Sequence, residues 1–402
     1  MPFLHHDEDL DTHLVIPMAM IRAGLLLAFV ACASLAIGQQ QAELVKASVQ
    51  SIVQPTIDKG RLAGAVVLVT NRDKVLLVEA MGLADRDTKR PMATDTLFWI
   101  ASMSKPMTAA AMMILVDEGK VSLDDPVAKH LPEFRGLWLT AQKTPDQIVL
   151  KRPRRAITVR DILSHTSGLP FASAVEQPTL DGAPLCLAVR SYTMLPLLFE
   201  PGMGYQYSNA GINTAGRIIE VISGMPYEQF MVDRLFKPLG MNDTSFRPVR
   251  GDLPRIATSY RANKDGTGLE EVQIAQLHYP LDDAGRYPIP GGGLFSTADD
   301  CGRFCQMVLG HGLCGSTRVL SQAAVEEMTR RQTPDSVKER YGLGFSLKED
   351  GSCGHDGAYA TAMSIDQARG LAVVWMVQDA GSPPEWRAVA GQVRAFGMQM
   401  EE

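Results

Sequence analysis

Hydrophobic residues along the chain recur with the periods of helices and of strands, and the period changes from one region to the next. Residues 42–58 carry aliphatic side chains at helical spacing, which predicts an amphipathic helix. Residues 63–70 and 74–80 are rich in β-branched residues and are joined by Asn71-Arg72-Asp73, which predicts a β-hairpin. The folded part of the chain is therefore expected to open with one helix and two strands.

The middle of the chain is predicted to be mainly helical and the end to return to strands. Residues 102–118 are rich in Ala, Met, Ile and Leu and stop at Gly119, as expected of a helix that ends on glycine. Further helices are predicted over 159–163, 210–223 and 386–398, and strands over 341–347, 358–365 and 371–378. This order predicts an α+β fold, in which strands from both termini form one antiparallel sheet flanked by helices, with an inserted, mostly helical lobe.

An apolar run near the N-terminus has the features of an export signal. Residues 23–37 follow Arg22 and lead into small residues and a polar stretch that begins at Gln39. The run is shorter than the roughly 18 to 20 residues that cross a bilayer, so it predicts a signal peptide over about 18–38 rather than a spanning helix. We expect an exported, periplasmic or extracellular protein. A lipid anchor on Cys32 is the alternative, which Phe29 fits poorly.

The rest of the chain is expected to be a single domain, because no Pro/Ser-rich or single-charge linker interrupts it. Residues 1–38 are then an N-terminal extension with the signal peptide, and residues 39–402 the domain. Its α/β lobe is placed at about 39–100 and 335–402, and its helical lobe at about 101–334. No stable membrane span is expected after signal removal, and the sequence leaves the oligomeric state open.

Composition and charge exclude several partner classes. The chain is 46% hydrophobic and 21% charged, an ordinary globular balance. The net charge is −6, and residues 1–38 hold four acids and one base, so the remainder is near −6 + 3 = −3 and no nucleic-acid partner is expected. One basic cluster lacks interleaved aromatics and is expected to be a solvated loop, with a phosphate or membrane patch as the alternative; it comprises Lys151, Arg152, Arg154 and Arg155.

The cysteines do not predict a metal site. Five remain once the signal is removed, an odd number that leaves at least one thiol unpaired within a monomer. Cys301, Cys305 and Cys314 lie close to His311, but their spacing matches no common zinc pattern. We expect a disulfide from Cys314 to Cys301 or Cys305, or plain buried thiols. Neither a metal nor a cofactor is expected.

Two short constellations suggest nucleophilic catalysis. Ser102 and Lys105 stand three residues apart at a helix start, so a lysine amine can reach the serine hydroxyl and the helix N-terminus can favour an oxyanion. A Tyr207-Ser208-Asn209 segment adds a phenol that can act as base or pass a proton, and an amide that can bind the lysine and a substrate carbonyl. Taken alone, each could also be a helix cap with a surface side chain.

A third constellation, His355-Asp356-Gly357, precedes Ala358. If Gly357 and Ala358 belong to an edge strand beside the site, the Ala358 and Ser102 N–H groups can form an oxyanion pair, with His355 facing the substrate. On its own the tripeptide is equally compatible with a turn before a strand. His165 could be a base, but without a G-x-S-x-G elbow residues 164–170 are interpreted as a structural turn.

The order Ser102–Lys105, Tyr207–Asn209, His355–Gly357 resembles the three-motif pattern of the serine β-lactamase and penicillin-binding-protein-like superfamily. The resemblance spans about residues 42–378 and is strongest to class C β-lactamases with the family VIII esterases and D-aminopeptidases. It implies a β-lactamase-like fold and an acyl-enzyme on Ser102. Further segments that carry the resemblance are residues 98–101, 163–170 and 291–297.

One departure from that pattern bears on the substrate. β-Lactamases of the superfamily resemble one another in a K-T-G lysine, where this chain has His355, whose ordinary pKa is near 6.5. We therefore expect a small ester, or a neutral amide or peptide, as substrate, and any activity on carboxylates should improve as the pH falls through the histidine pKa. The alternatives are a β-lactamase, a D-alanyl carboxypeptidase or D-aminopeptidase, and an acylated sensor without turnover.

Overall fold

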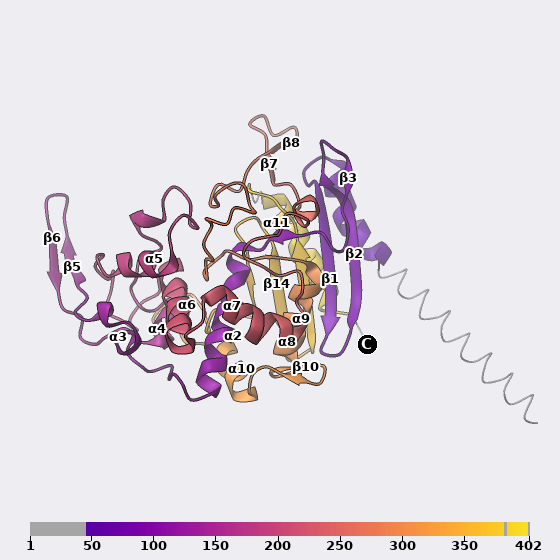
Figure 1. Ribbon diagram of the computed structural model, residues 1–402. Coiled ribbons are helices and arrows are strands. Elements are labelled where there is room, and N and C mark those ends of the chain that lie inside the picture. The colour runs from indigo at the N-terminus through magenta and orange to yellow at the C-terminus, as the bar shows by residue number, and fades with distance from the viewer. Residues whose placement is uncertain (1–45, 382–383, 401–402) are drawn as a thin grey trace, which may run out of the picture. The chain divides into compact units, whose positions relative to one another are not determined.

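The computed structural model describes residues 46–381 and 384–400, coloured in Figure 1. The chain divides into two units, residues 1–48 and 49–402. In the first unit only residues 46–48 are described, and residues 46–58 are helical. The predicted signal peptide over 18–38, including Cys32, lies outside the described residues.

The second unit is built on one antiparallel sheet of seven strands in the order β12-β13-β14-β15-β1-β2-β3. The central strand β1 pairs with β15 on one side and β2 on the other, so strands from opposite ends of the sequence meet at the middle of the sheet. This confirms the predicted α+β fold. The strands are β1 (Gly64–Asn71), β2 (Val75–Asp85), β3 (Arg90–Pro91), β12 (Ser346–Leu347), β13 (Cys353–Asp356), β14 (Ala362–Asp366) and β15 (Leu371–Met376).

Every residue of β1 is buried, because elements cover both faces of the sheet there. A strand covered on both faces has a continuous apolar run instead of an alternating one, as residues 64–69 show. Four short antiparallel pairs lie outside the sheet: β4 (Phe98–Trp99) with β9 (Phe295–Ser296), β5 (Leu139–Lys143) with β6 (Ile148–Lys151), β7 (Tyr260–Ala262) with β8 (Leu269–Glu271), and β10 (Leu313–Cys314) with β11 (Thr317–Arg318).

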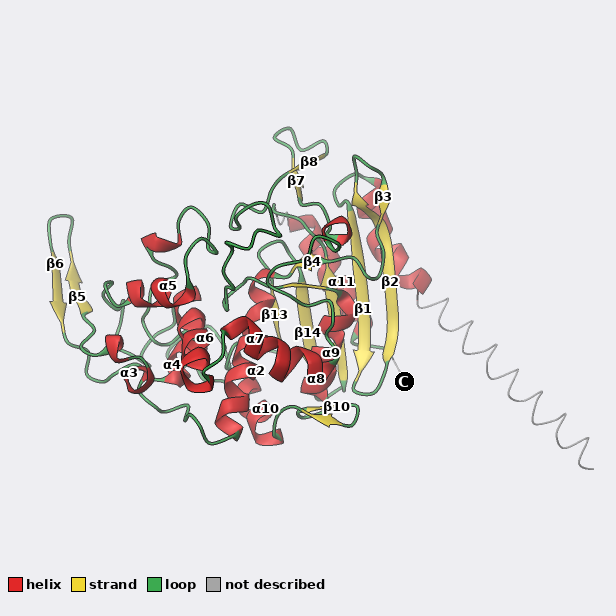
Figure 2. Ribbon diagram, in the orientation of Figure 1, coloured by secondary structure: helices red, strands yellow, loops and turns green. Residues whose placement is uncertain are grey.

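Most helices come from the middle of the chain, as Figure 2 shows in red. The α-helices are α2 (Ser104–Asp117), α3 (Val127–His130), α4 (Val159–Leu163), α5 (Leu185–Tyr192), α6 (Asn209–Ser223), α7 (Tyr227–Met231), α8 (Lys237–Leu239), α9 (Ala298–Leu309), α10 (Gln322–Thr329) and α11 (Pro384–Gly397). Shorter helical turns are η1 (Ala101–Met103), η2 (Pro132–Phe134), η3 (Ala174–Glu176), η4 (Val232–Phe236) and η5 (Leu253–Arg255). Helix α9 contacts β1 and β15, so the sheet-bearing lobe draws on residues well before 335.

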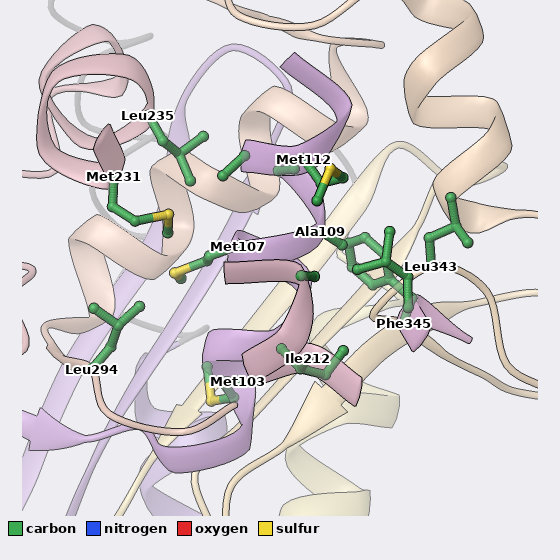
Figure 3. Packing of buried hydrophobic residues seen from close by; sticks show 14 of the residues in the cluster. Met103, Met107, Ala109, Met112, Ile212, Met231, Leu235, Leu294, Leu343 and Phe345 are labelled. Atoms are coloured by element: carbon green, nitrogen blue, oxygen red, sulfur yellow. The ribbon is translucent and has the colours of Figure 1, made fainter. Parts of the chain in front are cut away.

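Helix α2 is the central helix of the core. Twelve of its 14 residues are buried, which is expected of a helix that is apolar on all sides. Figure 3 shows Met107 and Met112 of α2 among buried side chains from other elements, including Met231, Leu235 and Leu343. Close packing on every side restrains the helix, and Ser102 lies in the turn that leads into it.

The region around residue 350 differs from the prediction. The strand expected over 341–347 is reduced to β12, and residues 353–356, for which no strand was predicted, form β13. Residues 358–361, expected to start a strand, form the turn between β13 and β14. The Gly357 N–H donates to the Thr361 carbonyl across this turn, and Ala360 has a positive φ of 71°, which ends the extended backbone.

The cysteines of the described chain are free thiols, so the disulfide alternatives from Cys314 are wrong. Cys301 and Cys305 are buried on α9, and burial raises the pKa of both thiols, which keeps them protonated. No group of three or more His, Cys, Asp and Glu side chains suited to a metal occurs among the described residues. Nor is any helix in the described part of the chain long and apolar enough to cross a membrane.

Candidate active site

Ser102 lies between a short strand and the central helix. β4 pairs with β9, and the Ile100 N–H donates to the Leu294 carbonyl, which fixes the approach to the turn η1. Ala101 then has a φ of +45°, a left-handed conformation that costs a non-glycine residue on the order of 1 kcal/mol. This turn places Ser102 ahead of α2 and leaves its side chain partly accessible.

Ser104 holds that turn and does not take part in the site. Its hydroxyl donates to the Ala101 carbonyl at 2.6 Å and accepts the Leu294 N–H at 3.2 Å. The side chain is fully buried. Both functions of the hydroxyl are therefore used within the fold, and Ser102 is the serine of the pair that a substrate can reach.

Lys105 is fully buried, and its amine meets three polar atoms. Nζ lies 2.9 Å from Ser102 Oγ, 2.8 Å from Asn209 Oδ1 and 2.6 Å from the Gly291 carbonyl. Within the described residues no carboxylate forms an ion pair with it. Burial therefore holds the pKa of Lys105 well below its ordinary value and favours the neutral amine.

Tyr207 and Asn209 complete the surroundings of the amine. The Tyr207 ring centroid is 4.7 Å from Lys105 Nζ. Burial raises the pKa of Tyr207 above its ordinary value, and a hydrogen bond with Ser102 only partly opposes this, so the phenol stays protonated. Ser208 caps α6 by accepting the Gly211 N–H at 3.0 Å, which leaves the Asn209 amide free to bind Lys105.

His355 lies close to these residues but is directed elsewhere. It is 7% exposed; Nδ1 is 2.8 Å from the Asp356 carbonyl and Nε2 is 2.9 Å from the Tyr341 hydroxyl. Burial, with a smaller effect of the charge of Lys105, lowers the pKa of His355 to about 3. The expectation that His355 faces the substrate and titrates in the physiological range is therefore corrected: the imidazole is neutral and its polar atoms are occupied.

Gly357 and Ala358 lie in the turn after β13, not in the edge strand that we expected. The turn nevertheless packs against the approach to Ser102. A Cβ on Gly357 would be 2.7 Å from the Ile100 carbonyl, and the Thr361 hydroxyl donates to the same carbonyl at 3.3 Å. Only glycine permits this close contact, which brings the Ala358 backbone toward η1.

Two aromatic residues that the sequence did not assign to the site support it. His165, with a φ of +62°, is fully buried and lies 4.6 Å from the rings of both Tyr207 and Tyr341. Its Nδ1 accepts the Ser208 N–H at 3.2 Å, so the expected structural turn at 164–170 positions the second motif directly. Burial lowers the pKa of His165 well below its ordinary value, and the imidazole is neutral.

A buried polar chain orients the Gly291 carbonyl that binds Lys105. Asn213 Oδ1 accepts the Gly291 N–H at 2.9 Å, and Asn213 Nδ2 donates to Glu176 Oε1 at 3.1 Å. A Cβ on Gly291 would be 3.0 Å from Asn209 Oδ1. The sequence singled out the glycines at 291–293 without a role, and it gave no signal for Asn213 or Glu176.

A serine beside a buried amine and a phenol, between an antiparallel sheet and a helical lobe, defines the class of serine hydrolases that use a lysine instead of a histidine. The family model for Beta-lactamase matches residues 49–397. The chain belongs to the beta-lactamase family and is a serine hydrolase of that family.

Three comparisons place it within the family. The chain is 33% identical over 363 residues to Protein Rv1367c of Mycobacterium tuberculosis, with 82% of this chain and 89% of that protein covered. It is 28% identical over 373 residues to Esterase EstB of Burkholderia gladioli, with 83% and 90% covered. Among solved structures, EstCE1, described as a hydrolase with promiscuous acyltransferase activity, superposes with a TM-score of 0.75 at 26% identity, covering 89% of this chain and 99% of that one.

Proposed function

We propose that the protein hydrolyses small, uncharged esters through an acyl-enzyme on Ser102, with Lys105 as the base. The observation that carries this proposal is the set of three contacts at Lys105 Nζ. A neutral amine has two N–H donors and one lone pair. Two of its neighbours, the Asn209 Oδ1 and the Gly291 carbonyl, can only accept, so they use both donors. The lone pair is left for the Ser102 hydroxyl proton, which is the geometry of a general base.

The remaining groups have matching roles. As Ser102 Oγ bonds to the substrate carbonyl carbon, its proton moves to Lys105, and the protonated Tyr207 phenol can give a proton to the departing alkoxide. Water then attacks the acyl-enzyme, and the same groups act in reverse. The Ala358 N–H has no acceptor among the described residues, and with the Ser102 N–H it would bind the oxyanion. Asn209 Nδ2 likewise makes no hydrogen bond within the described chain and is left for the substrate.

The surroundings of the site favour an uncharged substrate. The neutral His355 occupies the place at which the resembling β-lactamases carry a lysine, so it offers no charge to a carboxylate. Phe171 is 47% exposed and stacks on Tyr207 with centroids 6.2 Å apart, which gives the accessible side of the phenol an apolar wall. Apolar contact stabilises an aliphatic or aromatic acyl group more than a charged one.

The test combines a substrate screen with covalent labelling. We expect hydrolysis of short-chain p-nitrophenyl esters with a higher kcat/KM than that of a chromogenic cephalosporin or of D-alanyl peptides. A phosphonate should label Ser102, as peptide mass spectrometry will show, and Ser102→Ala should abolish both labelling and turnover. Ser104→Ala is the matched control. Faster cephalosporin turnover would contradict the ester assignment, and a stable adduct without turnover would indicate a sensor.

We also propose that the protein is exported and that cleavage occurs near Gln39, on the basis of the apolar run over 23–37. N-terminal sequencing of the natural protein tests this. A mature N-terminus near Gln39 in the extracytoplasmic fraction would support it, and an intact cytosolic chain would contradict it.

A further inference from the structure

The β5–β6 hairpin exposes large apolar side chains. It projects from the helical lobe in Figures 1 and 2, and every residue of β6 is exposed. Ile148 is 54% exposed, Leu150 41% and Trp138, just before β5, 45%. Aliphatic residues on a short hairpin with no covering element bring no packing energy to the fold, so their conservation of apolar character in this one segment calls for a partner.

The strand register gathers these side chains on one face. Ile148 and Leu150 are two residues apart in β6 and therefore point to the same side of the hairpin. Arg152, two residues further along, places its guanidinium 3.6 Å from the centroid of the Trp138 ring. Lys143 is the cross-strand partner of Ile148. The face thus has an apolar centre of Ile148, Leu150 and Trp138 with a cation at each end. We call it the hairpin face.

A basic cavity adjoins the hairpin face. It has a volume of about 410 Å³, and its lining includes four arginines and two apolar residues: Arg135, Arg152, Arg154, Arg155, Phe134 and Leu137. The segment 134–156 holds six basic residues and one acid, a net charge of 6 − 1 = +5 in a chain of net charge −6. Lys151 pairs with Glu200 and Arg155 with Asp161, whereas Arg135, Lys143 and Arg154 have no ion-pair partner among the described residues.

The size of the hairpin face argues against a protein partner. β5 has five residues and β6 four. Two strands of that length present a surface of roughly 17 Å by 10 Å, far below the about 800 Å² that each partner buries in a stable protein complex. A bilayer surface needs less: a few aliphatic side chains, an indole at the level of the headgroups and basic side chains for the phosphates.

We propose that the hairpin face docks on anionic phospholipid membranes. Ile148 and Leu150 enter the boundary between headgroups and acyl chains, the Trp138 indole lies at headgroup level, and Lys143 with the arginines of the cavity binds lipid phosphates. Docking would hold the hydrolase peripherally at a membrane surface without a spanning segment. The inference does not depend on the proposed esterase activity.

The experiment measures binding to lipid vesicles by co-sedimentation. With vesicles of phosphatidylcholine and about 30% phosphatidylglycerol, we expect at least tenfold stronger binding than with phosphatidylcholine alone. Ile148→Ser/Leu150→Ser should weaken binding at least tenfold. Its matched control is Val75→Ser/Val249→Ser, which changes two exposed valines elsewhere and should bind like the wild type. Arg154→Glu should likewise weaken binding, whereas Lys338→Glu should not.

Fluorescence distinguishes insertion from simple ion pairing. Brominated lipids should quench the emission of Trp138, and Trp138→Phe should remove that quenching although the other three tryptophans remain. Three outcomes would overturn the proposal. These are equal binding by the hairpin and control variants, equal binding to heparin with no quenching by lipid, and self-association that Ile148→Ser/Leu150→Ser abolishes, which would make a second copy the occupant. Circular dichroism of each variant confirms folding.

Discussion

Two adjoining clusters of titratable residues differ in where their polar atoms point. In the first, Lys105 and Tyr207 direct an amine and a phenol at Ser102, which solvent can reach. In the second, His355 and Tyr341 bond to each other. Both clusters are buried, and burial shifts the pKa of every member toward its neutral form. The comparison teaches that a perturbed pKa marks the neighbourhood of a site, whereas hydrogen-bond direction identifies the residues that react.

The largest effect is expected from the first cluster. Lys105→Ala and Tyr207→Phe should each lower kcat for p-nitrophenyl butyrate by about a thousandfold or more, because each removes part of one proton-transfer unit. The double variant should be little worse than either single one. Steady-state kinetics on all three decides this. Losses that multiply would show that the two residues act separately and that one of them is structural.

A smaller loss is expected from the residue that aims the amine. Gly291→Ala adds a Cβ 3.0 Å from Asn209 Oδ1, which forces a shift of a few tenths of an ångström beside Lys105 Nζ. We expect kcat to fall by about ten- to a hundredfold, with KM little changed, because misplacement affects the chemical step most. Gly251→Ala, which meets open space, is the matched control. Full activity in Gly291→Ala would remove the Gly291 carbonyl from the argument.

The lowered pKa of Lys105 predicts a pH dependence of stability. The unfolded chain binds the lysine proton up to an ordinary pKa of 10.5, while the folded chain has released it at a lower pH. Between these two values the unfolded state holds more protons, so stability rises with pH. Relative to Lys105→Met, the wild type should gain stability from about pH 7 to about pH 10, by at most about 1.4 kcal/mol per pH unit. Urea unfolding of both proteins tests this. A constant difference between them would mean that Lys105 is charged in the folded state.

The smallest kinetic effect is expected from the second cluster. His355→Gln retains an acceptor for Tyr341, so kcat/KM for a neutral ester should stay within about threefold, with a stability loss of about 1 kcal/mol from the altered hydrogen bonds. The activity profile from about pH 5 to pH 8 should keep its shape, because a pKa of about 3 lies outside that window. A pH-dependent gain on cephalosporins that His355→Gln abolishes would restore the substrate-facing role.

Much of the fold followed from local patterns. The hairpin over 63–80, the helix after residue 102 that stops at Gly119 and the strand from Leu371 all occur close to their predicted bounds. Their periodicity or their glycine stops are strong and local. The strand expected to start at Ala358 was wrong, since a short apolar run there did not reveal the turn that Gly357 and Thr361 close.

The sequence by itself determined the family pattern, the fold class and the three motifs, because each is a matter of residue type and spacing. Only the tertiary structure decided the protonation of Lys105, since its burial and its partner Gly291, 186 residues away, come from distant segments. It likewise turned His355 toward Tyr341 and stacked Arg152 on Trp138, giving the basic cluster the aromatic neighbour that the linear sequence lacks. Desolvation and hydrogen-bond direction depend on what surrounds a side chain in space, and spacing along the chain does not encode them.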